Sequence, residues 1–348
     1  MASIDTDGLE WLSDPDVTRW VLWGLDNMIW PVVVVAFVLF SVLLPGTFGT
    51  AQNVQFMLYA SAGLGALVLA ESLCLLSGNF DLSIGSIAGF SSMFTALFLN
   101  QWFPETPGIV GVFLILAIGG LIGLVNGVSI GYFGINPFLQ TLAFFIIFRG
   151  AVVMLSTLTV APLPDSYIFL GNAQFESVPV VGSIGFLSNL PVAVPLVILL
   201  FVVAWYVLNY TKLGLAIYAV GGDENSAKEA GIATERIVVL VFTVSGVLSG
   251  LAGLLYTGYL TAATPTLARG DLFPAFAAAV IGGISLFGGR GDIKNAFGGL
   301  ILLTMIQVGL VQLDVGPEQI QFFNGLVLIG AIYIYTFESR LRSRILSA

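Results

Sequence analysis

The chain has 348 residues, of which 57% are hydrophobic and 9% charged, with a formal net charge of −9, and its mean hydropathy is +1.01. A sequence this apolar has too little polar surface to cover a water-soluble fold of its size, which excludes a soluble globular protein. It contains no histidine and a single cysteine, Cys74, which excludes histidine metal sites, Ser-His-Asp triads and an internal disulfide.

The first 20 residues form a polar N-terminal segment. They carry five acidic residues against the single Arg19, so they lack the basic start of a secretory signal. We expect residues 1–20 to be a retained acidic cytoplasmic tail. A transmembrane domain over residues 21–340 and a short basic cytoplasmic tail over 341–348 are expected to follow.

Long apolar runs fill the rest of the chain. A transmembrane helix needs about 20 mostly apolar residues, and the sequence offers about ten such runs. They are continuous and do not alternate in polarity, which favours helices over a β-barrel. We therefore predict an all-α, multi-pass helix bundle in the cell membrane. In chain order the predicted spans are Asn27–Leu44, Val54–Ser77, Leu82–Leu99, Ile109–Ile130, Phe138–Leu155, Val192–Leu208, Ile237–Leu260, Phe273–Phe287, Phe297–Leu313 and Ile320–Phe337.

The basic residues predict the orientation of this bundle, because short cytoplasmic loops retain Lys and Arg. With both termini inside, only Arg269 faces outside and Arg149 lies within a span. The other nine basic residues then face the cytoplasm: Arg19, Lys212, Lys228, Arg236, Arg290, Lys294, Arg340, Arg342 and Arg344. The longest outer loop, residues 156–191, is predicted to lie across the outer mouth of the bundle.

Two stripes of small residues indicate close helix packing. Gly119, Gly123, Gly127 and Gly131 recur every four residues and fall on one helix face, where a neighbouring backbone can approach. A second stripe runs through Ser245, Gly246, Ser249, Gly250 and Gly253. Tight packing is favoured over a direct role in transport.

Polar side chains inside the spans are costly, so each is a candidate for the translocation pathway. The candidates are Glu71, Asn126, Thr141, Arg149 and Gln307. Glu71 and Arg149 are a possible buried ion pair, which would neutralise two charges at once. This structural pairing and a pathway role both stay open.

The cytoplasmic segment 209–236 has the features of a docking element. Asp223 is a good helix N-cap, and Glu224 suits the positive helix end. Gly231 followed by Ile232 suits a left-handed C-terminal stop. The predicted helix has about two turns, too few to be stable alone. A partner surface or the bundle itself must therefore hold it.

The same segment resembles the ATPase-contacting loop of ribose-type ATP-binding-cassette sugar import permeases. The likeness rests on Gly214, on the run Ala219–Asn225 and on Ala227–Ile232. Three further segments resemble the family in the same order along the chain. They are Ser77–Ser86, then Gly123–Gly134 with Asn136, Pro137, Phe138 and Thr141, and finally Gly282–Gly291.

The resemblance implies a permease core of about ten helices, paired with a second permease subunit as a homodimer or heterodimer. It also implies ATPase subunits that hold ATP and Mg on the cytoplasmic face, and an extracytoplasmic solute-binding protein that delivers a monosaccharide. No cofactor, metal, catalytic residue or nucleic-acid partner is expected on this chain. The implied coupling residues are Gly214, Gly221, Gly222, Asp223, Asn225, Ala227, Ala230, Gly231 and Ile232. The pathway candidates are Glu71, Asp81, Asn126, Asn136, Phe138, Thr141 and Arg149.

The sequence departs from the family at Glu71 and at Gln307-Val308, which replaces a polar pair. No Gly-x-x-x-x-Gly-Lys-Ser/Thr phosphate loop occurs, so energy must come from another subunit or an ion gradient. An ion-coupled secondary transporter and a non-transporting scaffold are the alternative functions. Asp81-Leu82 and Asp271-Leu272 each follow a hydrophobic span and precede a run of small residues, and the predicted topology places them on opposite faces of the membrane. An inverted repeat would produce this arrangement, and so would chance.

Overall fold

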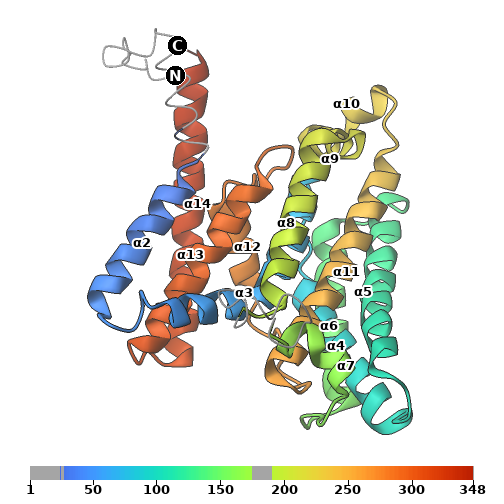
Figure 1. Cartoon of the computed structure of the whole chain (residues 1–348). Coiled ribbons are helices and arrows are strands. Elements are labelled where there is room, and N and C mark those ends of the chain that lie inside the picture. Colours follow the sequence, from blue (N-terminus) through green and yellow to red (C-terminus); the bar gives the residue numbers. More distant parts are fainter. Residues whose placement is uncertain (1–23, 25–26, 175–189, 348) are drawn as a thin grey trace.

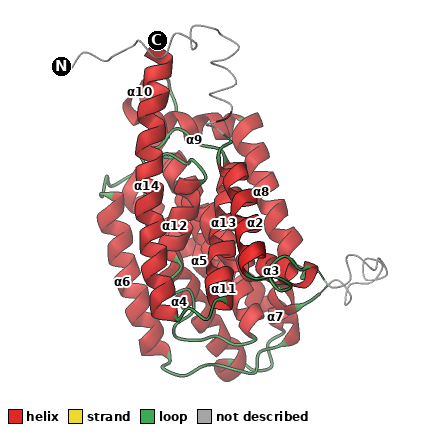
Figure 2. Cartoon of the chain, turned by 90° about the vertical axis from the view of Figure 1, so that its left-hand side faces the viewer, coloured by secondary structure: helices red, strands yellow, loops and turns green. Residues whose placement is uncertain are grey.

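The computed structural model describes residue 24, residues 27–174 and residues 190–347. The predicted acidic tail, residues 1–20, and part of the long outer loop therefore lie outside the described residues. The described part of the chain forms helices and no strand (Figure 2). The helices are α2 Ile29–Leu43, α3 Ala51–Leu76, α4 Ile84–Leu97, the π-helix η2 Phe98–Trp102, α5 Gly108–Gly131, α6 Pro137–Leu155, α7 Asp165–Asn172, α8 Ala193–Tyr210, α9 Lys212–Gly222, α10 Glu224–Glu229, α11 Thr234–Leu260, α12 Leu272–Ile281, α13 Ile293–Gln312 and α14 Pro317–Ser347.

Within these described ranges, 6 helices are long and apolar enough to cross a membrane: α3, α5, α6, α8, α11 and α13. The chain is thus a multi-pass membrane protein, as the composition predicts. The helices α2, α9 and α12 are apolar but shorter. The predicted span Phe273–Phe287 is too long, because α12 ends at Ile281 and the next glycines turn the chain, Gly283 with φ +85°. Helix α14 runs past the predicted end at Phe337 as far as Ser347.

Helix α3 passes through the centre of the bundle. It contacts α8, α11, α12 and α13, and in Figure 1 it crosses from the α2 and α13 side toward α8 and α11. Its last two turns are buried throughout. A helix surrounded by protein can carry polar side chains that a lipid-facing helix cannot, and α3 carries Glu71.

Glycines bring α5 and α11 into backbone contact. A Cβ added to Gly119 would overlap the carbonyl oxygen of Gly246, and one added to Gly123 would overlap that of Phe242. Gly250 lies in the same way against Ile115, with 2.6 Å between an added Cβ and the Ile115 carbonyl oxygen. Missing side chains therefore allow the two helices to pack closely, which confirms the packing interpretation of both small-residue stripes.

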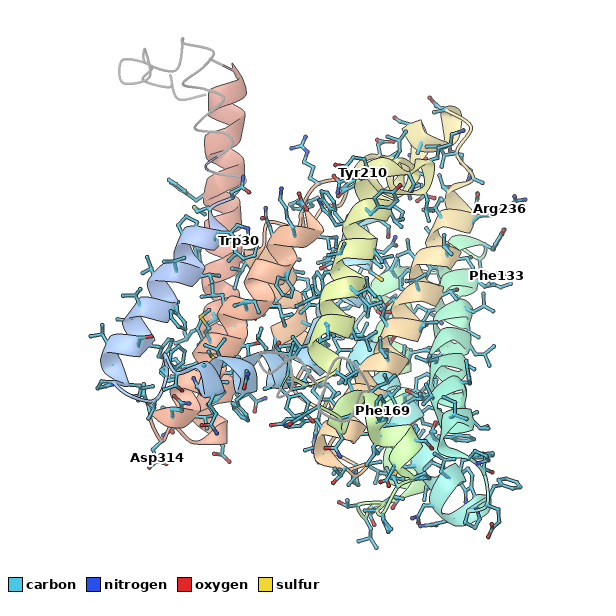
Figure 3. All side chains as sticks on the ribbon, viewed as in Figure 1. Trp30, Phe133, Phe169, Tyr210, Arg236 and Asp314 are labelled. Atoms are coloured by element: carbon cyan, nitrogen blue, oxygen red, sulfur yellow. The ribbon has the colours of Figure 1, made fainter. Side chains whose placement is uncertain are left out.

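Different segments of the chain form the two ends of the bundle. Figure 3 shows Tyr210 and Arg236 at the upper end, where α9 and α10 lie, and Phe169 and Asp314 at the lower end. At the lower end, the chain after α6 meets the chain after α11, where the backbones of Val160 and Ala263 form an isolated antiparallel bridge.

Candidate functional site

The predicted short helix between α8 and α11 is present as α10. The Asp223 carboxylate accepts a hydrogen bond from the Ser226 amide at 2.7 Å. Gly231 has φ +83°, and the Ile232 amide donates to the Ala227 carbonyl at 3.0 Å. Both capping predictions are therefore confirmed.

A second helix, α9, precedes α10 and was not predicted. Its N-cap is Thr211, whose hydroxyl accepts a hydrogen bond from the Gly214 amide at 3.3 Å. The turn from α8 into α9 is tight, because a Cβ on Gly214 would overlap the backbone of Leu208. The signal in the sequence was this threonine cap, followed by buried Ile217 and Val220 at helical spacing.

The outer surface of α10 is polar and exposed. Residues 222–226 and 228–231, which we call the α10 ledge, are exposed, whereas Ala227 points inward and is 4% exposed. Lys228 pairs with Glu235 of α11 at 2.5 Å, which raises the pKa of Lys228. Hydrogen bonds from Ser226 lower the pKa of Asp223. Among the predicted coupling residues, Gly222, Asp223, Asn225, Ala230 and Gly231 are thus exposed on the ledge, Gly214, Gly221 and Ala227 are buried, and Ile232 is partly buried against the core.

Beneath the ledge, the end of α9 meets two other segments through glycines. We call this contact of Gly78, Gly221, Gly222, Gly288 and Gly289 the glycine junction. A Cβ on Gly221 would overlap the carbonyl oxygen of the last α3 residue, and one on Gly288 would lie 2.6 Å from the Gly78 Cα. One on Gly289 would lie 2.5 Å from the Gly222 Cα. Backbone therefore touches backbone among α3, α9 and the loop 282–292.

Hydrogen bonds fix the same junction. The Gly289 amide donates to the Leu76 carbonyl at 3.0 Å, and the Tyr218 hydroxyl donates to the Gly291 carbonyl at 2.8 Å. Burial raises the pKa of Tyr218 to about 12. Because α9 continues directly into α10, the α10 ledge is connected through the contacts of the glycine junction to the end of α3 and to the loop that precedes α13.

A buried polar network follows the end of α3. The Asp81 carboxylate accepts hydrogen bonds from the Ser83 amide at 3.0 Å, the Ser83 hydroxyl at 2.5 Å and the Ser245 hydroxyl of α11 at 3.0 Å. Asn126 of α5 donates to the Ser83 hydroxyl at 3.1 Å and accepts from Gln140 of α6 at 3.4 Å. The structure thus brings together the predicted candidates Asp81 and Asn126.

Ser245 and Gln140 also belong to this network, although neither was among the pathway candidates. Ser245 was assigned to a packing stripe, and Gln140 carries no motif that singles it out. Only the folded chain brings them next to Asp81 and Asn126.

Arg149 and Glu71 belong to different clusters. The Arg149 guanidinium lies over the Phe145 ring, 5.8 Å from its centroid, and its charged neighbours are Arg269 and Asp271. The charged neighbour of Glu71 is Asp81. The salt bridges among the described residues do not include a Glu71–Arg149 pair, so the possible ion pair between them is not formed.

Asp271 was noted only as part of the possible repeat. It interacts with the Tyr256 side chain as well as with Arg149, so α6, α11 and the chain just before α12 contribute to this second cluster. Tyr256 was not predicted, because a tyrosine near the end of an apolar helix carries no specific signal.

The other pathway candidates have local roles in α6. Asn136 is exposed and caps the helix, accepting a hydrogen bond from the Leu139 amide at 3.3 Å. The Thr141 hydroxyl is buried and donates to the Pro137 carbonyl at 2.8 Å. Phe138 is 51% exposed. None of the three is part of the hydrogen-bond network around Asp81.

Residues 53–332 match a family described as "Branched-chain amino acid transport system / permease component". The chain is 32% identical over 304 residues to the fructose import permease protein of Rhizobium meliloti, covering 87% of this chain and 83% of the relative. It is 33% identical over 299 residues to the D-allose transport system permease protein of Escherichia coli, covering 85% of each. The ribose import permease protein of Haemophilus influenzae is 30% identical over 286 residues, which is 82% of this chain and 85% of the relative. No solved structure matches the chain.

Proposed function

The chain belongs to the family of permease components of the branched-chain amino acid transport system type, and from this membership we propose that it is the membrane subunit of an ATP-binding-cassette importer. The solute we propose is a monosaccharide, because relatives that match most of the chain are named for fructose, allose and ribose. Hydrolysis of ATP with Mg then takes place on a separate ATPase chain. We place the protein in the cell membrane with both termini inside, as the basic residues predict.

The observation that carries this proposal is the link between the α10 ledge and the glycine junction. The ledge presents exposed charged residues, including Asp223, Glu224 and Lys228, at the end of the bundle that carries Arg236 (Figure 3). Such a surface suits a protein partner. A partner that moves the ledge also moves α9, and the glycine junction passes that movement to α3 and to the loop before α13. The proposed coupling residues thus connect a docking surface to the central helix.

We further propose that the solute passes near the starts of α4 and α12, which would be equivalent parts of an inverted repeat. Asp81-Leu82 precedes α4, and Asp271-Leu272 marks the start of α12. A Cβ on Gly85, in the first turn of α4, would lie 2.9 Å from the Ala268 carbonyl and 3.9 Å from the Leu272 amide. The starts of two short helices therefore lie side by side, an arrangement that forms solute sites in several transporters.

The polar groups near these helix starts could hydrogen-bond a sugar. Asp81 and Asn126 lie beside α4, and Arg149, Tyr256 and Asp271 lie beside α12. A second permease subunit, identical or related, is proposed to complete the pathway. An extracytoplasmic solute-binding protein is proposed to dock at the end where α7 lies.

Site-directed crosslinking tests the ATPase contact. The native Cys74 is buried, so a cysteine placed in the ledge by Asn225→Cys becomes the accessible thiol. A thiol-directed photo-crosslinker in native membranes should join this cysteine to a protein with a phosphate-loop ATPase sequence, identified by mass spectrometry. The matched control is Leu158→Cys, at a residue that is 74% exposed and lies just after α6 at the other end of the bundle. An ATPase adduct that is absent from Asn225→Cys, or equally abundant in both variants, contradicts the proposal.

A further inference from the structure

Glu71 is a carboxyl group without a hydrogen-bond partner in the protein core. It lies on α3 and is 0% exposed. Within the described part of the chain, neither of its oxygens has a hydrogen-bond partner at standard distance. Buried polar groups are almost always satisfied, so such an exception calls for a specific cause. The proposed coupling mechanism does not use this side chain.

The charged group beside Glu71 is a second buried carboxyl group. Asp81 interacts with Glu71 through both its side chain and its backbone, and it is also 0% exposed. The two differ in their hydrogen bonds. Asp81 accepts three, two from Ser83 and one from Ser245. Hydrogen bonds donated to a carboxylate favour its ionised form, so Asp81 is the member of the pair suited to carry the negative charge.

Among the residues that the structure describes, no basic side chain pairs with either carboxyl group. The salt bridges among the described residues involve neither Glu71 nor Asp81. Cys74, an uncharged thiol one turn further along α3, is the other titratable group that interacts with Glu71 and Asp81. The helices packed against α3 carry their other charged or titratable groups at their ends or with other partners. These are Glu235 paired with Lys228, Arg236 exposed at the start of α11, Tyr259 against the Tyr59 ring, Lys294 paired with Asp292, Tyr218 bonded to Gly291, Asp271 beside Arg149 and Tyr256, Lys212 at the start of α9, and Tyr206 and Tyr210 on α8.

Two negative charges at this position would repel strongly, because water is excluded and no cation compensates them. Two carboxyl groups that share a buried site usually retain one proton between them. A bound metal ion is the other way to neutralise the pair, but it needs several free oxygen ligands. The Asp81 oxygens already accept three hydrogen bonds, which leaves only the two oxygens of Glu71 free.

We propose that Glu71 and Asp81 form a proton-binding site in the core of the permease, in which Glu71 carries the proton and Asp81 is ionised. Asp81 is bonded to α11 through Ser245, and through Ser83 it is connected to Asn126 of α5. Loss of the proton places a second charge between α3 and these helices and weakens their packing. Occupancy of the site by a proton is thereby linked to the arrangement of α3, α5 and α11.

Infrared spectroscopy of the purified protein tests the protonation directly. At neutral pH the wild type should show the carbonyl stretch of a protonated carboxylic acid, and the difference between wild type and Glu71→Gln should contain this band. Glu318→Gln removes an exposed glutamate and should leave the band in place. A wild-type spectrum that lacks the Glu71-dependent band overturns the proposal.

Thermal stability as a function of pH provides a second readout that does not depend on transport. A glutamine has the shape of a protonated glutamate, so Glu71→Gln should melt close to the wild type at neutral pH. As the pH becomes alkaline, the wild type should lose stability through deprotonation of Glu71, and the variant should lose less.

A variant that is strongly destabilised at neutral pH but still inserted shows that the charge of Glu71 is needed, and overturns the proposal. A sodium-dependent stabilisation that disappears in Glu71→Gln also overturns it, in favour of a metal-ion site. If Glu71→Gln fails to insert, the infrared spectra of the wild type and of the conservative variant Glu71→Asp decide.

Discussion

Gly221 and Gly222 are neighbours at the end of α9, yet their surroundings are opposite. A Cβ on Gly221 would overlap the Leu76 carbonyl oxygen, whereas one on Gly222 would meet nothing within 4 Å. We expect Gly221→Ala to destabilise the protein by about 1–3 kcal/mol, the usual cost of overpacking a rigid site. Gly222→Ala should be neutral or stabilising by up to about 1 kcal/mol, because alanine favours a helix. Thermal unfolding of both variants in detergent measures the difference.

The amount of sugar imported per ATP hydrolysed should also differ between these two variants. If the glycine junction transmits movement, Gly221→Ala protein that remains folded should hydrolyse ATP with its partner but import less sugar per ATP than Gly222→Ala. Equal coupling in the two variants would remove the junction from the mechanism.

The capping carboxylate of Asp223 predicts that the stability of the start of α10 depends on pH. Its pKa is lowered in the folded protein by hydrogen bonds from Ser226. Its contribution to stability is therefore fully present above the unfolded pKa of about 3.9 and is lost as the pH falls through the folded pKa. Hydrogen exchange at the Ser226 amide, corrected for its intrinsic rate, should accelerate over that range. Asp223→Asn keeps a capping side chain without a titratable group, so its protection should not change with pH. Protection lost equally in both proteins would contradict this role.

At the scale of elements, the most extensive contact between two helices is that of α5 with α11. Gly123→Ala places a methyl group on the Phe242 carbonyl oxygen and should cost about 1–3 kcal/mol by forcing the helices apart. The control is Gly150→Ala on α6, where nothing lies within 4 Å and alanine favours the helix. Unfolding midpoints in detergent compare the two. Equal midpoints would show that α5 and α11 can separate at no cost.

The elements that could be predicted are those with a local signal. The ends of α10 could be located because Asp223 and Gly231 act through their own backbone neighbourhood. The long spans were evident from apolar length alone. The end of α12 was missed, because Leu286 and Phe287 continue an apolar run that the backbone does not follow as a helix. Hydropathy measures composition, and it does not register the turn at Gly282 and Gly283.

Side-chain partners were harder to predict than elements. Glu71 and Arg149 lie within helices α3 and α6, as the sequence predicts, but their partners depend on how distant helices are placed. Arg149 lies near Asp271 and Glu71 lies near Asp81. Arg149 and Asp271 are 122 positions apart in the sequence, and Glu71 and Asp81 are 10 apart. The tertiary structure determines these contacts, and the spacing of residues in the sequence does not predict them.

For the whole molecule, the proposed orientation predicts which end faces the cytoplasm. A membrane-impermeant thiol reagent added to intact cells should label Leu158→Cys and leave Asn225→Cys unlabelled, because the two positions lie at opposite ends of the bundle. In inside-out vesicles the pattern should reverse. Labelling of Asn225→Cys from outside would invert the topology and separate the α10 ledge from any cytoplasmic ATPase.

The glycine junction also has a thermodynamic consequence for repeated cycles. Glycine has no side-chain rotamers, so no side-chain entropy is lost when the surfaces of Gly78, Gly221 and Gly288 come together. A contact formed by long side chains would have to order them again each time it closed. A junction made of bare backbone can separate and re-form in every turnover with two hydrogen bonds to break and remake, one from the Gly289 amide to Leu76 and one from the Tyr218 hydroxyl to Gly291.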